Sequence, residues 1–283
     1  MIPNHVTEWL AQQGYGAVVA QVPITGGCIS NGLSLETKSG SRFFLKTNSL
    51  APEDMFIREA EGLAAIRDVR EPRVPQSFLS ASDFLLLEDM QPTAPSDAYW
   101  PRLGRQLARL HQVTHSKFGF PHDNYIGSTP QPNLRTSDGF EFFAEHRLIF
   151  QARLARNAGL LESAAAANVE KLAHDLRNLV PDQPASLIHG DLWSGNAITD
   201  SRGEPVLIDP AVHYGWAEAE LGMTTMFGGF AREFYVAYQE IRSLETGWQE
   251  RLPIYNLYHW LNHLNLFGPA YRSQVEAVLN RFL

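Results

Sequence analysis

The chain has little cysteine, little positive charge and no long apolar run. Its single cysteine, Cys28, excludes an intrachain disulfide, and the cytoplasm is the compartment that we expect by default. The formal net charge is −8 and no basic run is present, so we expect no nucleic-acid partner, because phosphate backbones attract clustered lysine and arginine. No apolar stretch approaches the length needed to cross a bilayer, and residues 1–5 lack the charged and apolar segments of a secretion signal. We therefore expect no membrane association.

The composition is ordinary for a globular protein, with 44% hydrophobic and 19% charged residues, and 283 residues can form two lobes with a sizeable core. Apolar and alternating patterns predict strands within residues 17–47 and over 84–88, and a helix that opens near Pro52. Beyond residue 91 the pattern becomes mainly helical, interrupted by short strands only around 186–209. Helices are predicted over 139–158, 162–179, 218–243, 248–267 and 271–282. The chain is therefore expected to be an α+β protein with a β-rich lobe (residues 1–90) and a helical lobe (residues 91–283).

The most informative motif lies at residues 188–210. It reads His-x-Asp, four residues, Asn, a short turn, and then an apolar strand that ends in Asp. This is the spacing of a kinase phosphoryl-transfer site. In such a site Asp191 accepts the proton of the attacking hydroxyl, and Asn196 and Asp209 supply the hard oxygen ligands that Mg²⁺ needs when it bridges ATP phosphates.

Two features of the motif point away from protein kinases. Gly190 stands where an arginine usually follows the histidine, and Pro210-Ala211 stand where Phe-Gly usually follows the metal-binding aspartate. Each residue of the motif taken alone would more often be structural, for example as a turn residue or a strand-end cap. Their order and spacing together favour a kinase of small molecules.

The β-rich part carries candidates for the nucleotide site. A glycine-containing loop lies between two predicted strands, and glycine permits close backbone approach to phosphates. Lys46 ends the apolar strand of residues 42–46. Taken alone, it would more often be an edge lysine that extends its charge into solvent; in a kinase it holds the α- and β-phosphates and pairs with a carboxylate. Glu59 is the candidate partner, because it lies near the apolar face of its helix; it could also be an ordinary boundary residue. The residues expected to contact nucleotide are Gly26, Gly27, Cys28, Ser30, Lys46, Glu88, Asp89 and Met90, the last three because their backbone groups could bind adenine.

Cys28 lies within the expected phosphate-binding loop and has two interpretations. It could be a small apolar residue packed beneath the loop. Alternatively, its oxidation or an intermolecular disulfide could block ATP, so that the protein would be a monomer or a redox-linked dimer.

With these residues in hand, the chain resembles the fructosamine kinase family (fructosamine-3-kinase and ketosamine-3-kinase), which is similar to the aminoglycoside and choline phosphotransferases. The resemblance covers about residues 25–268. It rests on residues 26–31, 43–46, 118–120, 123–133, 189–196, 208–211, 257–258 and 261–268. It implies a two-lobed, protein-kinase-like fold that uses ATP and Mg²⁺ to phosphorylate O3 of a ketosamine, the adduct of a sugar with a small amine or a protein lysine. Phosphorylation destabilises the adduct, so the family is associated with deglycation.

The resemblance also implies residue roles. Asp191 is the proton acceptor, Lys46 and Glu59 form an ion pair, and Trp193 either contacts the sugar or anchors the catalytic loop. Departures from the family occur at residues 134–139 and at Glu220, where an aspartate is expected. A phosphotransferase for another hydroxyl compound, such as an aminoglycoside or choline, and a pseudokinase that binds ATP without turnover are the alternatives.

Overall fold

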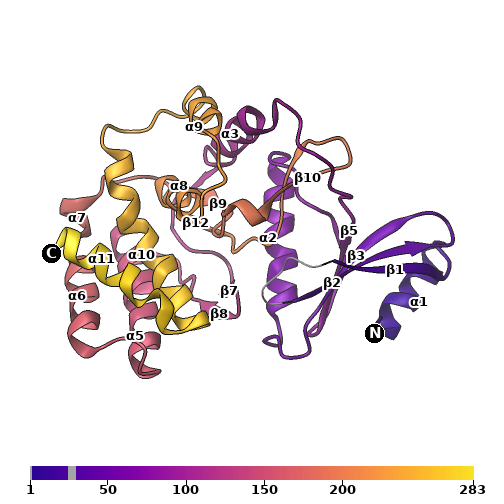
Figure 1. Cartoon of the computed structure of the whole chain (residues 1–283), viewed down its shortest axis with the longest axis horizontal. Helices are drawn as coiled ribbons and strands as arrows, with labels where there is room; N and C mark the ends of the chain where they lie inside the picture. Colours follow the sequence, from indigo (N-terminus) through magenta and orange to yellow (C-terminus); the bar gives the residue numbers. More distant parts are fainter. Residues whose placement is uncertain (1, 25–29) are drawn as a thin grey trace.

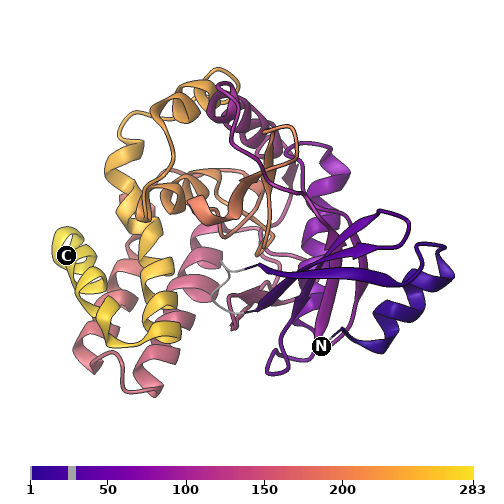
Figure 2. The same cartoon turned by 45° about the vertical axis from the view of Figure 1, so that its right-hand side comes forward.

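The computed structural model describes residues 2–24 and 30–283, and its N-terminal part is built around a five-stranded antiparallel sheet. The strand order is β1 (Val18–Ile24), β2 (Asn31–Thr37), β3 (Arg42–Thr47), β5 (Phe84–Glu88) and β4 (Ser77–Ser80). Residues 38–41 form the turn between β2 and β3. The sheet and the helical part lie on opposite sides of the molecule (Figures 1 and 2).

The two faces of this sheet carry different helices. Side chains alternate between the faces of a strand, so Phe43 and Leu45 of β3 point to one face and Phe44 and Lys46 to the other. Phe43 and Leu45 pack in a cluster with buried residues of α1 (Asn4–Gln12) on the outer side. Helix α2 (Met55–Val69) lies between the sheet and the helical part (Figure 1). Lys46 is thereby directed toward α2 and the remainder of the protein.

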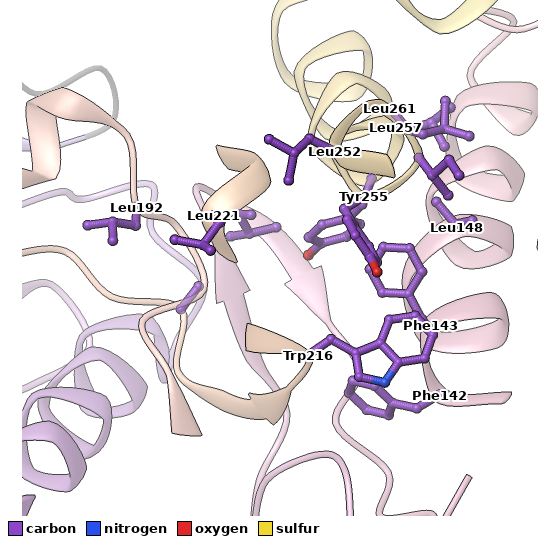
Figure 3. Close-up of a cluster of buried hydrophobic side chains, with 14 of the residues drawn as sticks. Phe142, Phe143, Leu148, Leu192, Trp216, Leu221, Leu252, Tyr255, Leu257 and Leu261 are labelled. Atoms are coloured by element: carbon purple, nitrogen blue, oxygen red, sulfur yellow. The ribbon is translucent and has the colours of Figure 1, made fainter. Parts of the chain in front are cut away.

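The C-terminal part is mainly helical. Its helices are α3 (Tyr99–Leu110), α4 (Gly139–Phe143), α5 (Phe150–Asn157), α6 (Ser163–His174), α7 (Leu176–Leu179), α8 (Ala217–Met226), α9 (Arg232–Gln239), α10 (Trp248–Phe267) and α11 (Arg272–Phe282). A π-helical segment, η1 (Ala144–Ile149), joins α4 to α5, and a 3-10 turn, η3 (Pro269–Tyr271), joins α10 to α11. These elements enclose one apolar core, in which Trp216 packs against Phe143 and Tyr255 (Figure 3).

Short strands carry the motif at residues 188–210. Strand β9 (Ala185–Ile188) lies between β6 (Thr114–His115) and β12 (His213–Gly215), and β10 (Ala197–Thr199) pairs with β11 (Pro205–Leu207). A second hairpin is formed by β7 (Asn124–Ile126) and β8 (Thr129–Gln131), and η2 (Ser194–Asn196) precedes β10. Leu192, next to Asp191, and Leu221, next to Glu220, are fully buried in the core (Figure 3). The core therefore anchors the segments that carry the site.

Most predicted elements are confirmed, with differences at particular places. Helix α10 has the predicted bounds, and α4, η1 and α5 together match the helix predicted over 139–158. The single helix predicted over 218–243 is wrong, because the chain breaks between α8 and α9 at Gly228 and Gly229, which both have positive φ. Helix α1 and strands β4, β6, β7, β8 and β12 were not predicted. Among residues 2–24 and 30–283, no helix has the length and apolar character to cross a bilayer.

Four histidines are buried in the fold: His111, His189, His213 and His259. Burial disfavours the charged imidazolium and lowers the pKa of each side chain, that of His259 to about 3. Histidine in an unfolded chain has a pKa near 6.5. Below that pH the unfolded chain binds protons that the folded chain does not, so acidification favours unfolding.

We expect the free energy of unfolding to fall as the pH is lowered below about 6.5. At pH 5.5, His259 alone contributes a loss of about 1.4 kcal/mol relative to neutral pH, and the other three histidines add to it, whereas Asp191, whose raised pKa of about 7 makes the folded chain bind a proton, opposes them. Urea unfolding between pH 5.5 and 7.5 measures this slope. His259→Phe should reduce the slope, whereas His174→Phe, at an exposed position of α6, should leave it nearly unchanged. Equal slopes for the wild type and His259→Phe would contradict the assignment.

Candidate active site

Lys46 forms an ion-pair cluster with two carboxylates. Its Nζ lies 2.8 Å and 2.9 Å from the two carboxylate oxygens of Glu59 on α2, and 3.0 Å from Oδ1 of Asp209. The Lys46 side chain is only 10% exposed. The structure thus brings together a lysine of the sheet, a glutamate of α2 and an aspartate from the C-terminal part.

The electrostatics of this cluster keep Lys46 protonated. Burial alone lowers the pKa of Lys46, but the charges of Asp209 and Glu59 outweigh it and raise the pKa above its usual range. A fixed positive charge therefore stands between the two parts of the molecule. Such a charge suits a site for phosphate oxygens.

Asp191 lies in a loop that is fixed by backbone hydrogen bonds. His189 donates from Nε2 to the carbonyl of Ile208 (2.9 Å), which leaves Nδ1 to accept from the Asp191 backbone N–H (3.3 Å). The Ala211 N–H donates to the His189 carbonyl (2.8 Å) and fastens the loop to the segment after Asp209. These hydrogen bonds give His189 a structural role, because both ring nitrogens bind the backbone. Burial, and then the charge of Asp209, raise the pKa of Asp191 to about 7, which is a suitable value for a general base near neutral pH.

Asn196 and Asp209 present oxygen atoms near Asp191. Nδ2 of Asn196 donates to the Asp191 carbonyl (2.8 Å) and to Oδ2 of Asp191 (3.3 Å), so its Oδ1 remains as an acceptor. The Ile208 N–H donates to the Asn196 carbonyl (3.0 Å), which ties the turn before β10 to the residue before Asp209. Asp209 has φ +56°, a left-handed conformation that non-glycine residues rarely adopt and that is common where function imposes strain. Amide and carboxylate oxygens are the donor types that Mg²⁺ prefers.

Glu220 holds the start of the loop at residues 189–196, which carries Asp191 and is called the catalytic loop below. Its carboxylate accepts hydrogen bonds from the backbone N–H of His189 (2.8 Å) and of Gly190 (2.6 Å), and from Nε2 of His111 (3.0 Å). Tyr238 donates from its hydroxyl to Nδ1 of His111 (2.8 Å) and fixes the tautomer. Burial raises the pKa of Glu220, but the hydrogen bonds that the carboxylate accepts from His111 and from the His189 N–H outweigh it, and the net pKa is lowered. The longer side chain thus reaches the loop despite the departure from aspartate.

Replacing Glu220 with glutamine is expected to lower the free energy of unfolding by about 1–3 kcal/mol and to reduce kcat. The two carboxylate oxygens of Glu220 accept hydrogen bonds from three donors. A carboxamide has only one acceptor oxygen, so a buried backbone N–H would lose its partner. Urea unfolding and steady-state kinetics measure both effects. Glu233→Gln, at an exposed position of α9, is the matched control. Wild-type stability in Glu220→Gln would exclude the anchoring role.

A cavity of about 770 Å³ joins these groups. It is lined by all ten predicted site residues that the structure describes, namely Ser30, Lys46, Glu59, Glu88, Asp89, Met90, Asp191, Trp193, Asn196 and Asp209. Gly26, Gly27 and Cys28 lie outside the described residues. The volume is within the range of small-molecule sites.

In the segment at residues 88–90, the side chains of Glu88 and Asp89 make structural contacts. Glu88 pairs with Arg73 (2.7 Å), and Asp89 accepts from the hydroxyl of Ser34 and from the Gln91 N–H (3.0 Å). Because the side chains are engaged, backbone groups are the ones left to contact a ligand. This arrangement agrees with the expected mode of adenine binding, which stays a prediction.

A buried polar network beneath the cavity has no counterpart in the predicted site. Asn124 accepts from Nε2 of Gln131 (2.7 Å) and from Nδ2 of Asn133 (2.8 Å), and it donates to the Val212 carbonyl (2.9 Å). Arg147 donates to Oδ1 of Asn133 (2.8 Å) from the π-helical segment. The network fastens the β7–β8 hairpin to the segment after Asp209. Residues 123–133 contributed to the resemblance, but the spacing of their polar residues in the sequence did not indicate what those residues do.

Comparison with known proteins agrees with this geometry. A family model described as fructosamine kinase matches residues 1–283. The chain belongs to the fructosamine kinase family. It is 42% identical over 265 residues to a probable ketoamine kinase of Synechocystis sp., covering 92% of this chain and 89% of that protein. It is 38% identical over 288 residues to a chloroplastic protein-ribulosamine 3-kinase of Oryza sativa subsp. indica, covering 98% and 83%.

Solved structures show the same fold. The crystal structure of a candidate fructosamine-3-kinase from Thermobifida fusca superposes with a TM-score of 0.88 at 31% identity, covering 99% of this chain and 98% of that chain. A macrolide 2′-phosphotransferase type I, at 14% identity and a TM-score of 0.64, shares the fold over 98% and 95% of the two chains. This fructosamine kinase family member therefore has the kinase-like architecture that the sequence predicted, and a kinase of this family uses ATP.

Proposed function

We propose that this protein transfers the γ-phosphate of ATP to the O3 hydroxyl of a ketosamine. The proposal rests on the convergence of Lys46, Asp191, Asn196 and Asp209 in one cavity of a fructosamine kinase family member. The identity of 36–42% to ketoamine and ribulosamine 3-kinases supports the substrate class. The ketosamine is either a small molecule or a glycated lysine of a protein, and the reaction serves deglycation.

Asp191 acts as the general base. One of its carboxylate oxygens accepts the proton of O3 while O3 forms a bond to the γ-phosphorus. The bond between that phosphorus and the oxygen bridging to the β-phosphate breaks, and ADP leaves with the electron pair. Asn196 holds the Asp191 carboxylate in place through its Nδ2, so the base and one metal-binding candidate are oriented together.

Lys46 and the two metal-binding candidates address the phosphate charge. Lys46, oriented by Glu59, binds oxygens of the α- and β-phosphates. Asn196 and Asp209 would hold Mg²⁺, which neutralises charge on the phosphates when bound. The backbone of Glu88, Asp89 and Met90 binds adenine. Gly26, Gly27, Cys28 and Ser30 are the proposed phosphate contacts from the glycine-containing segment. The lobes would thus divide near residue 90, so that residues 1–90 bind the nucleotide and residues 91–283 bind the acceptor. The proposed location of the protein is the cytoplasm.

An ADP-release assay tests this function against its rivals. The purified protein is given Mg²⁺-ATP with the fructose or ribulose adduct of methylamine, with an aminoglycoside, or with choline. ADP should form with the ketosamines and remain at the background rate with the other two acceptors. Turnover of only the aminoglycoside or choline would overturn the substrate assignment. ATP binding without ADP formation on any acceptor would instead support a pseudokinase.

A further inference from the structure

Five aromatic side chains form a continuous wall on one side of the cavity. This aromatic wall consists of Trp193, Phe227, His263, Phe267 and Tyr271, all of which line the cavity. Trp193 contacts Phe227 with ring centroids 6.1 Å apart, and Phe227 lies 5.2 Å from His263. His263 in turn lies 5.4 Å from Phe267 and 5.1 Å from Tyr271. The wall therefore extends from the catalytic loop to the end of α10 and to η3.

The wall begins beside the reacting groups. Trp193 is two residues after Asp191, and a Cβ added at Gly195 would come within 2.2 Å of the indole ring, so glycine leaves room for the ring over the loop. Phe227 and Phe267 are 43% and 47% exposed, which leaves apolar surface open to a ligand. Although Asp191 shares a loop with Trp193, the charged residues among the described cavity-lining residues all lie outside residues 223–271. They are Lys46, Arg58, Glu59, Glu88, Asp89, Asp191 and Asp209.

The chemistry of the acceptor determines what reaches this wall. In a ketosamine the nitrogen is attached to C1, so O3 and the nitrogen are separated by four bonds, about 5 Å when extended. With O3 at Asp191, the nitrogen and its substituent must lie next to the catalytic loop. The aromatic wall is the surface that continues from this loop away from the charged end of the cavity.

We propose that the aromatic wall binds the substituent on the ketosamine nitrogen and makes the enzyme prefer substituents that are aromatic or otherwise apolar. This inference rests on the proposed function and names the part of the substrate that the wall selects. Aromatic rings pack well in offset or edge-to-face arrangements, and a protonated amine is attracted to ring faces. A carboxylate next to the nitrogen, as in the adduct of an amino acid, would meet no cation of the wall and would be disfavoured.

His263 contributes a neutral ring to the wall. Its Nδ1 donates to the carbonyl of His259 (2.8 Å), so the lone pair is on Nε2 in the neutral form. Burial lowers the pKa of His263, which keeps the imidazole uncharged at neutral pH. A neutral imidazole accepts a hydrogen bond and does not repel a protonated amine.

The experiment compares fructose adducts of methylamine, benzylamine and glycine as acceptors. We expect kcat/KM for the benzylamine adduct to exceed that for the methylamine adduct about tenfold, mainly through KM, and the glycine adduct to be the poorest. In Phe267→Ala and Tyr271→Ala the ratio between the benzylamine and methylamine adducts should fall toward one. Val236→Ala, at an exposed position of α9 outside the cavity, should keep the wild-type ratio.

The outcomes separate this inference from the proposed function. Equal kcat/KM for the methylamine and benzylamine adducts in the wild type would overturn the inference while leaving the function intact. Retention of the wild-type ratio in both folded alanine variants would also overturn it. Absence of phosphorylation of all three adducts would overturn the function and the inference with it.

Discussion

Replacing Asp191 with asparagine is expected to lower kcat on the order of 10³-fold while ATP still binds. Asparagine preserves the size of the side chain but cannot accept the proton of O3 at neutral pH. The raised pKa of Asp191, about 7, shows that its surroundings favour proton uptake. Steady-state ADP release measures kcat, and calorimetric titration with a non-hydrolysable ATP analogue measures nucleotide binding.

The control for this change is Asp68→Asn, which alters an exposed carboxylate of α2 in the same way. Asp68→Asn should keep wild-type turnover. If Asp191→Asn turned over at a rate within a few-fold of the wild type, another group would have to be the base. A variant that lost both turnover and the thermal unfolding transition would be uninformative for chemistry, so unfolding is recorded for each protein.

Lys46→Met is expected to lower kcat/KM for ATP by about 10²–10³-fold, because the phosphates lose a positioned positive charge. Methionine retains the length and apolar stem of lysine. It leaves Glu59 and Asp209 without their shared cation, 2.8 Å and 3.0 Å from Nζ in the wild type. The effect should appear in ATP titrations more strongly than in titrations of the ketosamine.

The matched control is Lys38→Met, which changes an exposed lysine in the turn between β2 and β3. It should preserve the KM for ATP. Glu59→Gln should produce a smaller loss than Lys46→Met, since the lysine remains but is held less firmly. Wild-type kinetics in Lys46→Met would show that this lysine does not contact the phosphates.

The features that sequence could predict are those encoded by local pattern. The apolar runs at residues 42–46 and 84–88 indicated the strands that carry Lys46 and Glu88. The helical period of residues 55–69 placed Glu59 near the face that is buried. The spacing of Asp191, Asn196 and Asp209 follows from one loop and one hairpin. Such short-range constraints are visible in a single sequence.

The remaining features depend on contacts between distant segments. The break between α8 and α9 was missed because the apolar pattern continues on both sides of Gly228 and Gly229, although two adjacent glycines were a usable signal. The anchoring of the catalytic loop by Glu220 depends on His111, more than 100 residues earlier. The aromatic wall joins residues 193, 227 and 263–271, which only the tertiary fold brings together. The periodicity of apolar residues along the sequence does not indicate contacts between such distant residues.

The most direct test is to identify the phosphorylated atom. The fructose adduct of methylamine is incubated with the protein and Mg²⁺-ATP, and the product is examined by mass spectrometry and by phosphorus–proton correlation NMR. The account predicts the mass of one added phosphate and a correlation from phosphorus to the proton on C3. Phosphate on a different carbon, or unchanged substrate beside enzyme that binds ATP, would contradict it.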